Sequence, residues 1–302
     1  MLHATITASE RRKAFRSGLS SGRLLRFPGA FNPLSALLVE ELGFDGVYVS
    51  GAAIAADLGL PDIGLTTQTE VARRGHEVAR VTSLPALIDA DTGFGEPMNA
   101  ARTIQVLEEA GLSGCHIEDQ VNPKRCGHLE NKSVVPVEEM VHRIAAAVAA
   151  RRDPDFVICA RTDARAVEGF DAAVVRARAY IDAGADVIFP EALRDAAEFA
   201  KFRAALDAPM LANMTEFGQS ELLDATTLSN IGVNVVIYPV TLLRLAMGAI
   251  EAGLREIRDA GTQAGLLGSM QTRSRLYELV DYESYAAFDS EVVNFTTGRS
   301  SR

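Results

Sequence analysis

The chain alternates short apolar segments with longer amphipathic ones, and this alternation limits its possible folds more than any other feature. Eight apolar runs of strand length occupy residues 24–28, 45–50, 85–89, 114–118, 156–161, 186–191, 210–213 and 233–238. The pattern predicts helices over residues 32–42, 67–82, 98–110, 136–151, 170–183, 195–205, 219–228 and 241–259, and a small-residue loop at 51–53. Because the strands are apolar on both faces and alternate with helices, they are typical of a parallel sheet.

Eight strand–helix units predict an α/β fold, a closed (β/α)₈ barrel of the TIM type, rather than an open doubly wound sheet. The barrel is expected to form one catalytic domain over residues 1–260. Residues 261–302 do not fit a ninth unit. They predict a helical extension that packs on its own or a neighbouring subunit, with helices over 270–280 and 282–289. A further helix is expected over residues 9–19, and the tail 295–302 is expected to be loosely ordered.

Composition and charge argue against several kinds of partner. Of the 302 residues, 48% are apolar and 23% are charged, and the formal net charge is −10. A chain this acidic lacks the basic surface that nucleic acids and anionic membranes attract. No apolar run reaches the roughly 18 residues that span a bilayer, and the amino terminus lacks the apolar core of a secretory signal. Three cysteines without paired spacing indicate no disulfide framework, so we expect a cytoplasmic protein.

Polar and ionisable side chains follow the predicted strands at their carboxyl ends, where a (β/α)₈ barrel builds its catalytic site. The positions are Tyr48, Ser50, Asp89, Asp91, His116, Glu118, Asp119, Arg161, Thr162, Asp163, Glu191, Asn213, Thr215 and Tyr238, with Arg244 one helical turn after the last strand. One carboxylate at such a position often only caps the following helix. Seven strands that end in this way favour a pocket.

The segment Asp89-Ala90-Asp91 is a candidate metal site. In an extended strand these two aspartates share a face. Two neighbouring carboxylates require a cation or a shared proton, and oxygen ligands suit Mg²⁺ or Mn²⁺ held largely through water. Glu118 and Asp119 offer further carboxylates for that water. The alternative is that Asp91 caps a turn.

The loop Lys124-Arg125-Cys126-Gly127-His128 brings together a thiol, two cations, an imidazole and a glycine. Positive neighbours lower the pKa of a thiol, so the two cations are expected to tune Cys126. The alternative is a basic surface loop with an inert cysteine. None of the four lysines ends a predicted strand, which argues against a Schiff-base aldolase. The remaining interpretation is an enzyme that makes or breaks a carbon–carbon bond with the help of a metal ion.

From Lys13 to Phe288 the chain resembles the isocitrate lyase/phosphoenolpyruvate mutase superfamily, and within it the 2-methylisocitrate lyase family. The segments that carry the resemblance are Tyr-Val-Ser-Gly (48–51), Leu-Gly-Leu-Pro-Asp (58–62), Asp-Ala-Asp-Thr-Gly-Phe-Gly (89–95), His-Ile-Glu-Asp-Gln (116–120), Lys-Arg-Cys-Gly-His (124–128), Ala-Arg-Thr-Asp-Ala (160–164), Phe-Pro-Glu-Ala (189–192), Asn-Met-Thr-Glu-Phe-Gly (213–218) and Met-Gln-Thr-Arg (270–273). The cysteine loop narrows the choice to the lyases.

The resemblance implies a Mg²⁺-dependent, retro-aldol-type cleavage of 2-methylisocitrate, an anionic tricarboxylate, to pyruvate and succinate in propionate catabolism. It implies Asp89 and Asp91 as metal ligands, Cys126 as the acid, Tyr48 as the base and Arg161 as a further catalytic group. The substrate-binding residues that it implies are Ser50, Gly51, Ala52, Gly127, His128, Glu191, Asn213, Met214, Thr215, Arg244 and Arg273. The supporting groups around them are Asp62, His116, Glu118, Lys124 and Arg125.

Two departures from the family pattern bear on the substrate. Alanine follows Ser50-Gly51 where some relatives have glycine, and Met214 replaces a branched aliphatic residue. A related lyase for isocitrate, dimethylmalate or oxaloacetate is therefore the alternative enzyme. An inactive barrel that serves as a binding or assembly module would have lost the acidic pair or the cysteine, and this chain has both. The resemblance also implies a homo-oligomer, a tetramer in which subunits exchange the eighth helix.

Overall fold

The computed structural model describes residues 5–128 and 132–295, and eight short strands form its centre. They are β1 (Leu25–Pro28), β2 (Val47–Val49), β3 (Ala86–Asp89), β4 (Gly114–Glu118), β5 (Val157–Thr162), β6 (Val187–Pro190), β7 (Leu211–Asn213) and β8 (Val235–Tyr238). All pair in parallel, in the orders β2-β3-β4-β5-β6 and β1-β8-β7. Single bridges from Gly29 to Tyr48 and from Ile188 to Met210 join the two sheets at both edges. The predicted closed (β/α)₈ barrel is confirmed.

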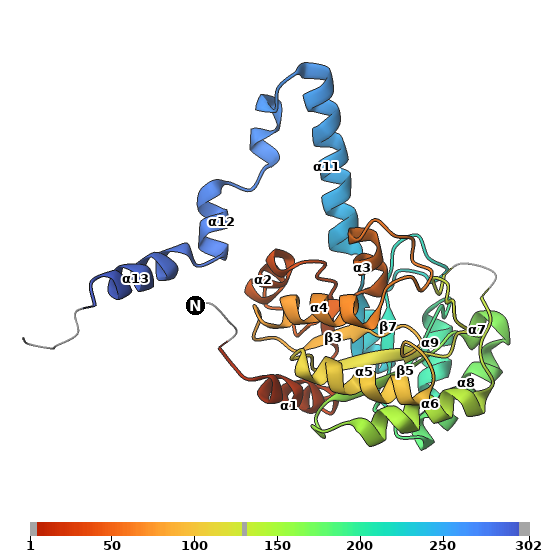
Figure 1. Cartoon of the computed structure of the whole chain (residues 1–302). Coiled ribbons are helices and arrows are strands. Elements are labelled where there is room, and N and C mark those ends of the chain that lie inside the picture. Colours follow the sequence, from red (N-terminus) through yellow and green to blue (C-terminus); the bar gives the residue numbers. More distant parts are fainter. Residues whose placement is uncertain (1–4, 129–131, 296–302) are drawn as a thin grey trace, which may run out of the picture.

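Helices surround these strands (Figure 1). They are α1 (Ala8–Leu19), α2 (Pro33–Glu41), α3 (Gly51–Asp57), α4 (Gln68–Ala79), α5 (Pro97–Glu109), α6 (Val137–Ala150), α7 (Ala164–Val167), α8 (Phe170–Asp182), α9 (Ala196–Ala204) and α10 (Ala225–Ile231). The chain continues as α11 (Thr241–Ala260), a 3₁₀ helix (Ala264–Ser269), α12 (Arg273–Leu279) and α13 (Tyr282–Val293). No helix among the described residues is long and apolar enough to cross a membrane.

The barrel interior and the layer between strands and helices form two separate apolar clusters. The interior cluster includes Phe27, Leu87 and Phe189 from the strands, and Phe15 of α1 packs against it. Because side chains alternate along a strand, every second residue faces the interior. The polar strand ends continue this inward series: Asp89 follows Leu87, Arg161 follows Cys159, Glu191 follows Phe189 and Asn213 follows Leu211. The strand periodicity thus directs these polar groups to one mouth of the barrel.

Two local predictions were wrong. The small-residue loop after β2 is instead helix α3, which begins where the Ser50 hydroxyl accepts a hydrogen bond from the Ala53 amide at 3.4 Å. The helix expected over residues 219–228 begins later, as α10, because the Asp224 carboxylate accepts the Thr227 amide at 2.9 Å and caps its first turn.

The eighth helix, α11, does not cover the barrel of its own chain. It projects away from the strands (Figure 1), and none of its residues is buried among the described residues. Its exposed apolar side chains are Leu245, Met247, Ile250, Leu254 and Ile257. The chain then returns toward α2, where the Arg275 guanidinium of α12 pairs with Glu41 at 2.6 Å. The extension is helical as expected. α11 projects from the barrel together with the extension and does not cover the strands.

Candidate active site

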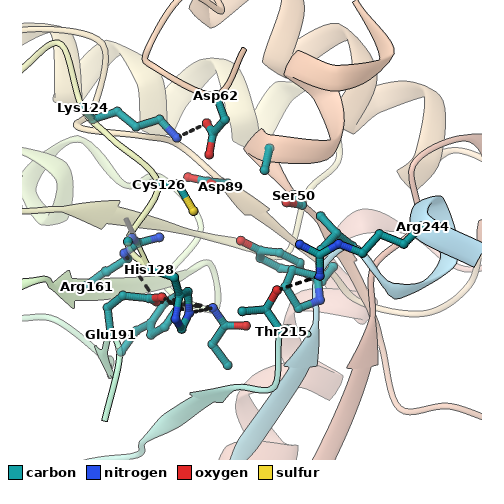
Figure 2. A pocket seen from close by; sticks show the side chains of 17 residues that line it. Ser50, Asp62, Asp89, Lys124, Cys126, His128, Arg161, Glu191, Thr215 and Arg244 are labelled. Carbon is teal, nitrogen blue, oxygen red and sulfur yellow. Dashed lines mark hydrogen bonds and ion pairs between the residues drawn. The ribbon is translucent and has the colours of Figure 1, made fainter. Parts of the chain in front are cut away.

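A pocket opens at the carboxyl ends of the strands (Figure 2). The residues that line it are Tyr48, Ser50, Ala52, Asp62, Asp89, Lys124, Cys126, Gly127, His128, Arg161, Phe189, Glu191, Asn213, Thr215, Pro239, Val240 and Arg244. They come from the ends of most of the strands and from the cysteine loop, which lies across the mouth. Most residues that the sequence singled out are therefore together in one place.

The acidic pair lies at one wall of the pocket. Asp89 ends β3, and its carboxylate accepts the Asp91 amide at 3.0 Å and the Gly51 amide at 3.2 Å. Asp91 lies beyond the strand, in the left-handed region with φ of 45°, so the two aspartates do not share a face of an extended strand as expected. The Asp91 carboxylate contacts Lys124 at 2.9 Å and accepts the Thr66 hydroxyl at 3.3 Å instead of capping a turn.

Lys124 places a buried ammonium group beside this pair. Its Nζ atom also bonds to Asp62 (Figure 2). Burial opposes the charged form of Lys124, but the carboxylates of Asp91 and Glu118 outweigh burial and raise the pKa of the lysine well above its ordinary value. The wall therefore already holds one cation against four carboxylates, those of Asp62, Asp89, Asp91 and Glu118.

The residues of this wall fit a hard divalent ion. Both carboxylate oxygens of Glu118 are buried without a hydrogen bond partner among the described residues. No three His, Cys, Asp or Glu side chains of the described ranges converge on one point. Two carboxylates with water in the remaining positions match the way Mg²⁺ binds proteins, because this ion keeps several of its waters. Asp89 and Asp91 would hold the ion, and Glu118 would hold its water.

Arg161 is the fixed cation of the pocket floor. Its Nε atom lies 2.9 Å from Asp163 Oδ2, and its Nη1 atom lies 3.3 Å from Glu118 Oε2. The guanidinium lies over the Phe189 ring at 5.2 Å from the centroid. An arginine held on two edges and one face keeps its orientation when an anionic ligand arrives.

Tyr48, the predicted base, is buried beside His116. Its hydroxyl is 2.7 Å from His116 Nε2, and burial, with the nearby Asp89 charge, raises the pKa of Tyr48 well above its ordinary value. Burial lowers the pKa of His116 to about 4, so this imidazole is neutral. Tyr48 is therefore a neutral phenol that donates a hydrogen bond to His116, and it can act as the expected base only by passing this proton on.

Cys126 is protonated as well, and this corrects an expectation. Burial raises the pKa of its thiol, although the backbone of His128 opposes the shift. Neither adjacent cation tunes the thiol as expected: Lys124 turns to the acidic wall, and Arg125 donates to backbone carbonyls at 3.0 Å and 3.1 Å. In Figure 2 the sulfur points into the pocket. A protonated thiol at this position is a proton donor.

The rest of the cysteine loop contacts the pocket floor directly. His128 accepts the Gln219 amide at Nδ1, at 3.0 Å, so its proton is on Nε2, which lies 2.6 Å from Glu191 Oε1. Asn213 donates to the same carboxylate at 3.3 Å. A Cβ atom on Gly127 would lie 2.3 Å from Arg161 Nη2, so only glycine fits there. The loop and the floor are thus in van der Waals contact.

The opposite wall holds the second arginine of the pocket. The Arg244 side chain donates to the Thr215 hydroxyl at 3.3 Å and pairs with Glu216 at 2.6 Å. Its guanidinium lies 5.4 Å from the centroid of the exposed Phe217 ring. The pocket thus has one arginine on its floor and another on the opposite wall, an arrangement that suits an anion with charge at both ends.

Several predicted residues lie elsewhere. Met214 is buried behind the wall, where its sulfur accepts the Leu223 amide at 3.3 Å. Gly51 contributes only its amide to Asp89, and Arg125 faces away from the pocket. Arg273 begins α12 on the extension and is not among the residues that line the pocket of its own chain.

Sequence reasoning missed other residues at the site. Phe189, Pro239 and Val240 supply apolar wall, and the ordinary apolar character of these residues gave no signal. Lys132 was also missed: it lies behind the pocket and forms a buried pair with the strand-end residue Asp163, 2.7 Å away. The chain has only four lysines among 302 residues, and this rarity is the sequence signal that could have drawn attention to Lys132.

A closed parallel barrel with a carboxylate pair, two arginines and a thiol at its mouth defines an α/β-barrel enzyme that acts on a small anion. The sequence model of the family described as phosphoenolpyruvate phosphomutase matches residues 15–258. A probable 2-methylisocitrate lyase 2 of Corynebacterium glutamicum is 61% identical over 98% of this chain and 96% of that protein. The chain therefore belongs to the 2-methylisocitrate lyase family of the isocitrate lyase/phosphoenolpyruvate mutase superfamily.

Solved structures agree with this assignment. Oxaloacetate acetylhydrolase in complex with 3,3-difluorooxalacetate superposes with a TM-score of 0.89 at 34% identity, over 96% of this chain and 99% of that one. Phosphonopyruvate hydrolase, solved with oxalate and Mg²⁺, gives a TM-score of 0.86 at 30% identity, over 96% and 100% of the two chains. Members of the superfamily thus bind a divalent metal.

Proposed function

We propose that this protein cleaves 2-methylisocitrate to pyruvate and succinate with the help of Mg²⁺, as a step of propionate catabolism. One observation supports the proposal most: a protonated thiol, Cys126, faces a pocket that also holds a carboxylate pair and a buried arginine. Cleavage of this substrate needs positive charge beside the oxygens of the forming pyruvate and a proton for the carbanion of the forming succinate. The pocket offers both in one place.

The reaction breaks the bond between the hydroxyl-bearing carbon and its neighbour. The substrate hydroxyl passes its proton to the Tyr48 oxygen while Tyr48 passes its own to the neutral His116 imidazole, 2.7 Å away. The carbonyl of pyruvate forms, and the electron pair of the broken bond stays on the succinate carbon. The Cys126 thiol then gives its proton to that carbon, and the resulting thiolate is reprotonated before the next turnover. Mg²⁺, held by Asp89 and Asp91, supplies a Lewis acid for the oxygens of the pyruvate half.

The chain's own residues orient the substrate. Ser50, Ala52 and Arg161 would bind the pyruvate half, and Tyr48 would relay the hydroxyl proton to His116. The residues proposed for the succinate half and its carboxylates are Gly127, His128, Glu191, Asn213, Thr215 and Arg244. Gly51 supports Asp89 through its amide. Desolvation by the cysteine loop strengthens each of these interactions.

A substrate panel tests the proposal. Initial rates with 2-methylisocitrate, isocitrate, 2,3-dimethylmalate and oxaloacetate are measured with Mg²⁺, and the first is expected to have the highest kcat/KM. EDTA is expected to abolish activity and Mg²⁺ to restore it. The likeness to oxaloacetate acetylhydrolase makes oxaloacetate the informative competitor. A higher kcat/KM for any competitor contradicts the assignment of the substrate.

Met247, Ile250, Leu254 and Ile257 form an apolar stripe along α11. This stripe supports a further part of the proposal, a homo-oligomer in which α11 packs on a second copy. Such a stripe, exposed over the length of a helix, marks a protein interface. Arg273, which lies on the extension beyond α11, would then serve the pocket of that second copy. A tetramer is the proposed state.

A thiol that works as an acid must stay reduced, which supports a cytoplasmic setting.

A further inference from the structure

Lys132 is a buried lysine that the proposed mechanism does not use. Its side chain is only 2% exposed, and it does not line the pocket. The ammonium group makes two contacts: it donates to the carbonyl oxygen of Gly127, and it pairs with Asp163 Oδ1 at 2.7 Å. The first contact is to the residue directly after Cys126. Lys132 therefore connects the backbone that carries the thiol to the barrel.

Asp163, the residue of the barrel that pairs with Lys132, is held in place by several buried hydrogen bonds. The Asp163 amide donates to Asp119 Oδ1 at 2.9 Å, and its carboxylate accepts Arg161 Nε at 2.9 Å and Nη2 at 3.2 Å. Asp119 in turn accepts the hydroxyls of Thr162 and Tyr180 at 2.7 Å and 2.8 Å. All these contacts are buried. An ammonium bound to Asp163 thus has a fixed position relative to the pocket floor.

Charge explains why a lysine occupies this position. Glu118, Asp163 and Glu191 surround Arg161 and are almost fully buried, so the floor holds three carboxylates for one guanidinium. Lys132 adds a second positive charge on the side of Asp163. A buried charge of either sign is tolerated only when it is paired and hydrogen-bonded, and Lys132 meets both conditions.

We propose that Lys132 is a positioning residue for Cys126. It holds the Gly127 carbonyl against Asp163, and this contact fixes the peptide that follows Cys126 and the direction of the thiol. The inference rests on the proposed role of Cys126 as the acid. Lys132 itself touches no substrate, so its effect on the reaction passes through the position of the loop.

The experiment compares Lys132→Met, which removes the charge and keeps most of the volume, with Lys132→Arg, which keeps the charge. Lys13→Met, on the exposed face of α1, is the matched control. Two readouts are needed: kcat and KM for 2-methylisocitrate, and the rate at which iodoacetamide alkylates the substrate-free enzyme. Cys115 and Cys159 are fully buried, so alkylation reports on Cys126. Melting temperatures verify that each variant folds.

For Lys132→Met we expect alkylation to become at least about threefold faster and kcat to fall by about 10- to 100-fold, with KM nearly unchanged, because a charge-assisted contact is lost. Lys132→Arg is expected to alkylate near the wild-type rate and to recover part of kcat. Unchanged alkylation in Lys132→Met overturns the positioning role, whatever happens to kcat. Faster alkylation with wild-type kcat supports the positioning role and contradicts the acid role of Cys126 instead.

Discussion

At the scale of single residues, the direction of a side chain matters more than its neighbours in sequence. Cys126 follows two cations directly, yet both turn away from the sulfur, and burial keeps the thiol protonated. A nucleophilic cysteine needs the opposite environment, one that stabilises the thiolate. The site therefore favours proton donation over covalent catalysis.

Replacing the thiol tests this role. Cys126→Ser is expected to lower kcat by about 10²- to 10⁴-fold, the usual contribution of a general acid, while the melting temperature changes little. Steady-state kinetics with 2-methylisocitrate provide the measurement. Cys115→Ala removes a thiol from β4, outside the pocket, and is expected to keep kcat near the wild-type value. Near-normal turnover by Cys126→Ser would refute the acid role.

The protonation of Cys126 also predicts a pH dependence. Only the thiolate reacts with iodoacetamide, and burial raises the pKa of Cys126, so the alkylation rate of the free enzyme is expected to rise with pH. The midpoint is expected above the value of about 8.5 that is ordinary for a free cysteine. The rate is measured from pH 6 to pH 10, with glutathione as the reference thiol. A midpoint below that of glutathione contradicts the burial argument.

At the scale of elements, the strands were predictable and the loops were not. The period-two pattern that buries Leu87 and Phe189 also directs Asp89 and Glu191 to the mouth, so strand ends and pocket follow from one rule. Loop contacts have no such period. The partners of Lys124, Arg125 and Lys132 depend on how the cysteine loop crosses the barrel mouth, which no local pattern encodes. The start of α10 likewise depended on the single cap at Asp224.

A buried arginine, Arg12, is one of the residues that attach helix α1 to the barrel. Arg12 donates to the carbonyl oxygens of Leu112 at 2.8 Å and Glu108 at 2.5 Å, and it pairs with Asp153 at 2.9 Å. Arg12→Met is expected to lower the free energy of unfolding by about 2–4 kcal/mol, because buried acceptors lose a charged donor. Urea denaturation measures the change. Lys13→Met, the exposed neighbour, is the control, and an equal effect of both variants contradicts the prediction.

The same contact predicts how stability responds to acid. Burial tends to raise the pKa of Asp153, but the hydrogen bonds from Arg12 and the Asp155 amide, together with the charge of Arg12, outweigh it and the pKa is lowered. A lowered carboxyl pKa stabilises the fold above the ordinary value near 4, and this contribution is lost as the pH falls below it. The difference in melting temperature between the wild type and Arg12→Met is therefore expected to shrink from pH 6 to pH 3. A constant difference contradicts this.

At the scale of the whole molecule, the chain closes a ring of eight strands but leaves its eighth helix and the helical extension uncovered. α11 carries an apolar stripe and, within the described part of the chain, buries none of its residues. The extension returns to the barrel through few contacts, among them the pair of Arg275 with Glu41. An apolar helix of this length is stable in water only when another surface covers it. This agrees with the proposed assembly of several copies.

One charge on the stripe tests the assembly. Leu254 is 63% exposed in a single chain, so Leu254→Asp should leave the barrel unaffected but disrupt a covered interface. Sedimentation velocity at micromolar concentration is expected to show the variant as a smaller species than the wild type. Ala252→Asp puts the same charge on the opposite side of α11 and serves as the control. Identical sedimentation of the wild type and Leu254→Asp contradicts the proposal.

The projection of α11 also has a consequence for the rate at which activity returns after unfolding. The barrel strands pair within one chain, whereas in the proposed assembly α11 is covered by a second copy, so the proposal assigns different rate laws to the two events. Recovery of barrel secondary structure after dilution from urea should be independent of protein concentration. Recovery of the native sedimentation should become faster in proportion to concentration, as expected for a bimolecular step. The concentration of chains, and not the stability of the barrel, then sets how quickly the complete enzyme appears.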